Sequence, residues 1–130
     1  AGGKMSEEPD YIITVWAVPR PKQSFRYGQH RGYRSAAVEE WESEVKAAAL
    51  RMYPGELLEG KICVAIDFSL KRDADLDNLC KGTLDALQGI VFRDDRQIVE
   101  LRARKLVTRK EHFARIAIWR RSLEHTRTLD

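Results

Sequence analysis

Six aspartates lie in the stretch from residue 73 to residue 95, which reads DADLDNLCKGTLDALQGIVFRDD. The whole chain has 20 acidic residues and a formal net charge of +3, so a basic protein concentrates much of its acid here. Clustered carboxylates repel one another unless a positive charge offsets them, and a divalent cation with oxygen ligands is a common solution. The stretch therefore predicts a metal site of the kind used in phosphate chemistry.

The middle of this stretch has the pattern of an amphipathic helix. Its apolar residues recur at spacings of three and four and form the predicted core face: Leu76, Leu79, Cys80, Thr83, Leu84, Ala86 and Leu87. The other face is polar and carries Asp77, Asn78, Lys81, Asp85 and Gln88. We expect Asp77 to cap the first amides of the helix and Gly89 to end it.

The polar face also has an ordinary interpretation. Asp77, Lys81 and Asp85 are four residues apart, as on any solvated helix, where each such pair contributes about 0.2–0.5 kcal/mol. Other features favour a metal site. Asp75 lies two residues before Asp77, so both carboxylates can reach one point near the helix start. A second acidic pair, at positions 94 and 95, follows a short apolar run that can fold back alongside.

The ordered run DLDNLCKGTLDALQGIVFRDDRQIVELRARK, residues 75–105, is similar to the core motif of the RusA family of endodeoxyribonucleases, which resolve Holliday junctions. The family pattern is D-x-D-N-x-x-K, then D-A-L, then a glycine, a short hydrophobic run and D-D-x-Q-[IV], and every position is filled here. The resemblance implies a compact α+β fold, a homodimer, Mg²⁺ as cofactor with Mn²⁺ as a substitute, and products with 5′-phosphate and 3′-hydroxyl ends.

The resemblance also implies a role for each residue of the motif. Asp75 and Asp77 match the two metal-binding aspartates of the family, and Asp95 matches its third catalytic carboxylate and metal ligand. Lys81 matches the essential catalytic lysine, whose ammonium group can hold the scissile phosphate or a leaving oxygen as a point charge. Positions that support the site are matched by Asn78, Asp85, Asp94 and Gln97. Asp73 lies outside the motif and is expected to be a surface carboxylate, while the direction of Asp67 stays open.

A basic segment, RPKQSFRYGQHRGYRS over residues 20–35, contains aromatic residues and no acid. It could be a solvated loop that is merely basic. We favour an arm that grips the phosphate backbone and stacks its aromatic rings on unpaired bases at a branch point. The DNA-contacting residues predicted in this arm and just before the acidic helix are Arg20, Lys22, Phe25, Arg26, Tyr27, Arg31, Tyr33, Arg34, Lys71 and Arg72. Basic residues between positions 102 and 121 could continue this surface.

The other elements follow from periodicity. Strands are predicted over residues 11–18, 61–70, 97–107 and 112–120, and a helix over 35–52 is capped by Ser35. The apolar stripe of that helix comprises Trp41, Val45, Ala48, Ala49 and Met52. The turn at 108–111 predicts that the last two strands form a hairpin. The order β-α-β-α-β-β predicts the α+β class: a small mixed or antiparallel sheet of about four strands with two helices packed on one face.

At 130 residues the chain is expected to form one domain, over residues 10–122. Residues 1–9 are expected to be disordered, with 1–4 a cloning remnant before Met5, and residues 123–130 a polar tail. Cys63 and Cys80 lie in apolar patterns and are expected to be buried thiols. No apolar run reaches the length of a membrane span and no signal peptide is visible, so we expect a cytoplasmic protein with no membrane partner.

Together these features predict a Mg²⁺-dependent endonuclease that cuts branched DNA, specifically a four-way junction. A homodimer suits this reaction because symmetric cuts in two strands require two active sites related by a two-fold axis. Two other functions remain open. One is a catalytically silent protein that binds branched DNA, although the complete acidic set argues against it. The other is a nucleotide phosphohydrolase, which would not need the basic aromatic arm.

Overall fold

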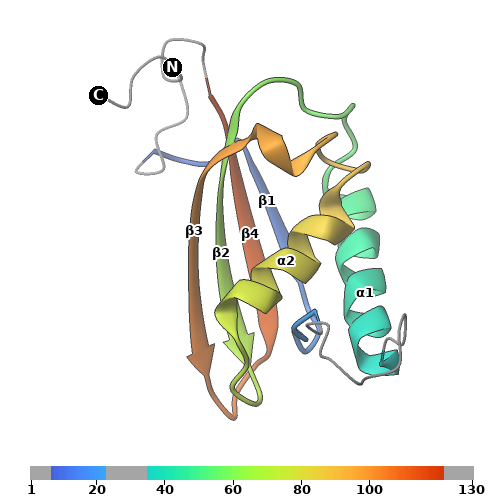
Figure 1. Ribbon diagram of the computed structural model, residues 1–130, viewed down its shortest axis with the longest axis vertical. Helices are drawn as coiled ribbons and strands as arrows, with labels where there is room; N and C mark the ends of the chain where they lie inside the picture. The colour runs from blue at the N-terminus through green and yellow to red at the C-terminus, as the bar shows by residue number, and fades with distance from the viewer. Residues whose placement is uncertain (1–6, 23–34, 122–130) are drawn as a thin grey trace, which may run out of the picture.

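A computed structural model describes residues 7–22 and 35–121 (Figure 1). The elements in chain order are β1 (Tyr11–Val15), α1 (Ala36–Met52), β2 (Ile62–Leu70), α2 (Leu76–Leu87), a 3₁₀ turn η1 (Asp95–Gln97), β3 (Ile98–Val107) and β4 (Phe113–Arg120). They confirm the predicted α+β class and the order β-α-β-α-β-β. None of the helices in the described ranges is long and apolar enough to cross a membrane.

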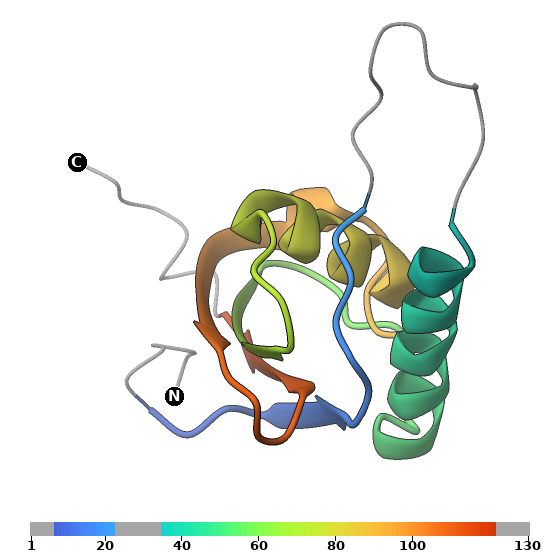
Figure 2. The same ribbon diagram turned by 90° about the horizontal axis from the view of Figure 1, so that it is seen from below.

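The four strands form one mixed sheet in the order β1-β4-β2-β3. β4 runs antiparallel to both β1 and β2, whereas β3 runs parallel to β2. The parallel pair follows from the connection, because α2 carries the chain back to the end at which β2 began. Figure 2, viewed from below, shows the sheet curling around the core, with α1 and α2 on the same side of it.

The predicted hairpin between the last two strands is wrong. β3 and β4 both pair with β2, on its opposite sides, so they are not neighbours. The connecting turn crosses the end of β2, where the Ser69 hydroxyl donates to the Glu111 carbonyl oxygen at 2.6 Å and the Thr108 amide donates to the Leu70 carbonyl oxygen at 2.8 Å. The run from Ala114 to Trp119 is buried at every position but one, and such a strand is stable only inside a sheet.

The alternation of residues along β2 divides its side chains between the two faces of the sheet. Ile62, Val64, Ile66 and Phe68 lie in the main core beneath the helices. The alternate residues face the other side of the sheet, where Cys63 belongs to a small separate cluster with Ala117 and Trp119 from β4. Each fully buried aliphatic side chain contributes about 1.5–3 kcal/mol. Among the described residues, the helix-covered face therefore holds most of the buried apolar side chains and supplies most of the stability.

The first strand and first helix differ from their predictions only at their ends. Ser35 caps α1 as expected, because its hydroxyl accepts a hydrogen bond from the Val38 amide at 3.1 Å. Met52, which the sequence predicts in the apolar stripe, is exposed. Tyr53 fills the core at this point instead, with its ring edge-on to Tyr11 at 4.9 Å between centroids. β1 ends at Val15, three residues earlier than predicted.

Candidate active site

The start of α2 presents two carboxylates to solvent. The structure corrects the predicted cap: Asp75, not Asp77, is the N-cap residue, and its side chain makes no capping hydrogen bond. Asp77 lies in the first turn, where the positive end of the helix dipole favours its negative charge. Both side chains are exposed and neither forms an ion pair with a described residue. Lys81 is also exposed and lies one turn beyond Asp77.

Asp95 lies at the opposite end of the same helix. Its backbone amide donates to Gln88 Oε1 at 3.2 Å, and Gln88 is the C-cap residue of α2. A helix of 12 residues is about 18 Å long, so its length separates the two acidic groups. Figure 1 shows the same arrangement, with the turn before β3 beside the far end of α2. Within the described ranges, no three His, Cys, Asp or Glu residues are grouped closely enough to hold a metal.

The fold-back expected from the sequence therefore does not occur within one chain. α2 runs without interruption from the N-cap to Gln88, and Gly89, at φ +85°, then ends it as predicted. The chain after Gly89 therefore leaves α2 at the end opposite Asp75, and Asp95 lies at that end. As a result, one chain by itself brings together two of the three predicted metal ligands.

Gln97 holds the turn that carries Asp95. Its side-chain oxygen accepts from the amides of Arg93 at 2.8 Å and Asp94 at 3.0 Å. Its side-chain nitrogen donates to the carbonyl oxygens of Leu58 at 2.8 Å and Gly60 at 2.9 Å. One amide side chain thus satisfies four backbone groups from two segments. This explains physically why glutamine suits this position of the motif.

Asp94 contributes to the same turn. Its carboxylate accepts from the Arg96 amide at 2.8 Å, and together with Gln97 it forms a capping box. The hydrogen bond from the Arg96 backbone is the main reason that the pKa of Asp94 is lowered. The Asp94 carboxylate therefore already has a hydrogen-bond partner within the turn, whereas the neighbouring Asp95 carboxylate is exposed.

The base of the basic arm is attached to the polar face of α2. Lys22 Nζ lies 2.5 Å from Asp85 Oδ2, and the Lys22 amide donates to the Asn78 carbonyl oxygen at 3.1 Å. The chain passes so close to Gly82 that a Cβ there would lie 3.3 Å from Lys22 Cβ. Lys22 therefore anchors the arm. The predicted contacts Phe25, Arg26, Tyr27, Arg31, Tyr33 and Arg34 lie outside the described residues.

Other charged residues near α2 have distinct surroundings. Lys71 and Arg72 are exposed on the loop that leads into α2, and Arg20 is partly exposed.

Asp73, expected to be a surface carboxylate, pairs with Lys105 Nζ at 2.8 Å, and this hydrogen bond is the first cause of its lowered pKa. Lys105 also donates to the Ala74 carbonyl oxygen at 2.8 Å, so it holds the loop before Asp75. Sequence reasoning missed this role, because the partners are far apart in the chain.

Asp67 and Cys80 do not belong to the exposed acidic set. Asp67 points to the other face of the sheet, where its carboxylate accepts from Arg104 Nε at 2.8 Å. Cys80 is a free, buried thiol, as predicted. Burial, followed by the negative charge of Asp77, raises the pKa of Cys80 to about 11. The thiol is therefore neutral near pH 7 and does not supply a thiolate ligand.

Replacing Gln97 with leucine should destabilise the protein. Four backbone groups lose their partner, and at about 1 kcal/mol for each hydrogen bond the expected loss is about 2–4 kcal/mol. Urea denaturation of the variant measures it. Gln88→Leu is the matched control, because the Gln88 side chain accepts one bond, from Asp95. Equal stability of the two variants would contradict the role given to Gln97.

Replacing Asp85 with asparagine should loosen the base of the arm without unfolding the protein. The ion pair with Lys22 is about one-third exposed, so its loss should cost no more than about 1 kcal/mol. Trypsin should then cleave after Lys22 faster than in the wild type. Asp67→Asn, which removes a carboxylate of similar exposure from an ion pair on the other face of the sheet, should leave that rate unchanged. Unaltered cleavage in Asp85→Asn would show that the pair does not anchor the arm.

The family model for endodeoxyribonuclease RusA matches residues 16–118 of the chain. No curated protein matches the chain significantly. The family match covers most of the chain and includes the loop before α2, α2 itself, the turn that holds Asp95, and all of β3. The family match agrees with two features of the structure, which are the exposed carboxylates and the turn held by Gln97. The chain therefore belongs to the RusA family of endodeoxyribonucleases, the enzymes that cut Holliday junctions.

Proposed function

We propose that this Holliday junction endonuclease depends on Mg²⁺ and acts as a homodimer with shared active sites. Each site would take Asp75 and Asp77 from one copy and Asp95 of the partner subunit. The observation that carries the proposal is the position of these acids at opposite ends of α2 in one chain. Three carboxylates can meet only if the third comes from elsewhere.

A two-fold axis offers a simple way to complete the set. Two copies whose α2 helices lie antiparallel across such an axis bring the start of one helix beside the end of the other. The same operation creates two identical sites, because every contact in a two-fold interface occurs twice. Two symmetric cuts in a four-way junction require two sites of this kind.

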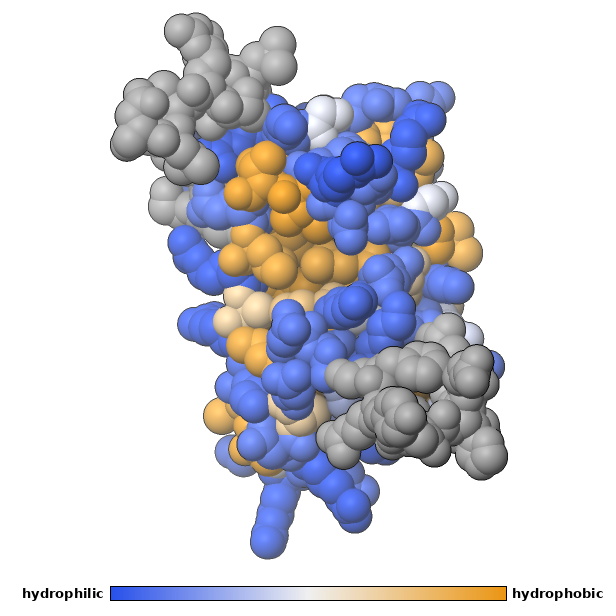
Figure 3. Space-filling model, in the orientation of Figure 1, coloured by the Kyte–Doolittle hydropathy of each residue, from blue (hydrophilic) through white to orange (hydrophobic). Residues whose placement is uncertain are grey.

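The edge of the sheet beside α2 supports a second copy at this place. β3 is an edge strand of ten residues, and four of its apolar side chains are 43–65% exposed: Val99, Leu101, Leu106 and Val107. Figure 3 shows apolar surface gathered over the upper part of β3 and extending toward α2. Long, apolar edge strands are normally covered, because their free backbone groups invite pairing with other strands. A second copy would cover this edge.

The residues of the proposed site suit a hard cation and an anionic substrate. Carboxylate oxygens are the ligands that Mg²⁺ prefers, and the bound ion would lower the pKa of the attacking water and offset charge on the phosphate. Asp77 contributes its charge at the positive end of a helix dipole. Lys81 lies one turn further along the same exposed face, where its ammonium group would hold the scissile phosphate.

Asp75→Asn should abolish cleavage and keep binding. A synthetic four-way junction and a matched linear duplex would be incubated with Mg²⁺ and either protein. We expect paired nicks in the junction from the wild type, at least about a hundredfold less from the variant, and no cleavage in EDTA. Junction binding without cleavage by the wild type would instead identify a silent DNA-binding protein. If neither occurs, nucleotides become the next substrates to test.

Mixing two inactive variants tests the shared site directly. In a heterodimer of Asp75→Asn and Asp95→Asn, a shared arrangement puts both changes in one site and leaves the other site intact. Random exchange of subunits should then restore nicking at about a quarter of all sites, one strand per junction. If each site is built from a single chain, no mixture restores activity. Subunit exchange would be verified with a size-tagged copy, so that a negative result counts against sharing.

A further inference from the structure

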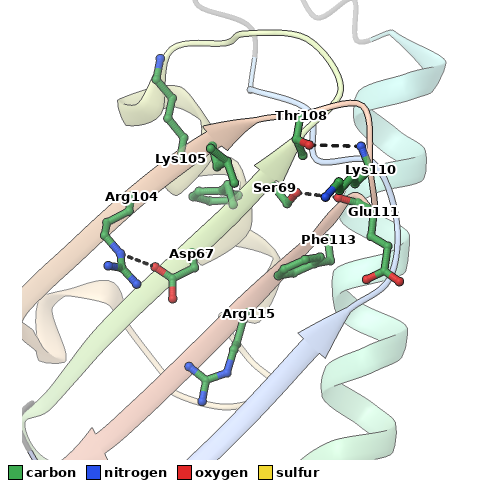
Figure 4. A pocket seen from close by; sticks show the side chains of 11 residues that line it. Asp67, Ser69, Arg104, Lys105, Thr108, Lys110, Glu111, Phe113 and Arg115 are labelled. Atoms are coloured by element: carbon green, nitrogen blue, oxygen red, sulfur yellow. Dashed lines mark hydrogen bonds and ion pairs between the residues drawn. The ribbon is translucent and has the colours of Figure 1, made fainter.

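Among the described residues, no helix packs on the face of the sheet away from α1 and α2, and this face is hollowed at one end. A pocket of about 1040 Å³ lies there, with a lining from the ends of β2 and β3, the start of β4 and the turn between β3 and β4. Figure 4 shows this pocket with Phe113 and Arg115 beside Asp67 and Ser69. We call it the open-face pocket. Neither Asp75 nor Asp77 lines it, so it is distinct from the proposed metal site.

An aromatic pair forms one side of this region. Trp16, just beyond β1, is 65% exposed, and its ring lies 5.2 Å from that of Phe113, tilted by 53°. Folding leaves most of this apolar indole in contact with water. An exposed apolar surface of this kind indicates a site that binds a partner. Exposed rings on a sheet are a common platform on which unpaired bases stack.

The same face carries unpaired positive charge. The strand register places Arg115 beside Thr14 and Arg102 beside Ala65, on the side of the sheet opposite the helices. Arg102, Lys110 and Arg115 form no ion pair with any described residue. Cations beside exposed rings favour a phosphate-bearing partner. A second copy of the chain suits this surface less well, because a two-fold contact would set arginine near arginine.

The pocket connects to the catalytic end of α2 through one side chain. Lys105 lines the pocket and also contacts Asp73 and the Ala74 carbonyl oxygen, both at 2.8 Å, in the loop that ends at Asp75. The pocket and the loop before Asp75 therefore share one residue, Lys105.

We propose that the open-face pocket binds unpaired nucleotides of branched DNA, with bases stacked on Trp16 and Phe113 and phosphates held by Arg115 and Lys110. The proposal rests on DNA as the substrate, which family membership supplies, and not on the shared metal site. It predicts a specific affinity for single strands, which the cleavage of duplex arms at a junction does not by itself require.

Oligothymidylate of about twelve nucleotides, in EDTA, is the probe. Of the three tryptophans, Trp41 and Trp119 are buried, so quenching of emission on binding should come from Trp16 and vanish in Trp16→Phe. Trp16→Ala should weaken binding about tenfold, measured by the anisotropy of a labelled oligonucleotide. Arg115→Gln should weaken binding several-fold and reduce the slope of log affinity against log salt by about 0.7.

Two matched variants control for general effects. Leu50→Ala removes an exposed apolar side chain from α1, and Arg51→Gln removes the same charge as Arg115→Gln, also on α1. Both should bind oligothymidylate within about twofold of the wild type, since stacking and phosphate contacts at the pocket are intact. Near-UV circular dichroism verifies that all variants are folded.

Three results would overturn the proposal. These are wild-type protein that does not bind oligothymidylate, Trp16→Ala and Arg115→Gln that bind like their controls, or a Trp16→Ala variant that sediments as a smaller species. The last would make this face an interface between copies. Because EDTA removes Mg²⁺ from the assay, none of these results bears on cleavage, and the junction experiment with Asp75→Asn is judged separately.

Discussion

The burial of α2 against the sheet is the constraint on which the rest of the structure depends. Leu79 and Leu87 are completely buried, and side chains of this kind contribute about 1.5–3 kcal/mol each. The Trp41 indole of α1 donates to Thr83 Oγ1 at 3.3 Å, which ties the two helices together. A helix held in this way acts as a rigid spacer. It keeps Asp75 and Asp95 a full helix length apart.

Part of the acidic motif serves structure, and its remaining members are exposed to solvent. Gln97 and Asp94 build the turn before β3, and Asp85 holds the base of the arm through Lys22. These groups are satisfied by protein partners. Asp75, Asp77 and Asp95 are exposed instead. The division is the one expected of a site that receives an ion and a phosphate, because groups already satisfied inside the protein have little left to offer a ligand.

The two faces of the sheet have different roles. Both helices pack on one face and complete the core there. The other face keeps a small cluster around Cys63 at one end and the open-face pocket at the other. β2 lies between β4 and β3 and contributes to both faces, since its side chains alternate. The proposed metal site and the proposed pocket thus lie on opposite sides of the sheet, joined at one end by Lys105.

The sequence by itself determined the features that arise within a few residues. These are the Ser35 cap, the end of α2 at Gly89, the two faces of β2, and the ordered motif that identified the family. Tertiary structure decided the order of the strands. β4 lies inside the sheet because residues far from it in the sequence bury both of its faces. It also decided the pair between Lys22 and Asp85, which are 63 positions apart and produce no periodic signal. The distance between Asp75 and Asp95 is likewise tertiary, since sequence spacing does not say whether a chain folds back or continues as a rigid helix.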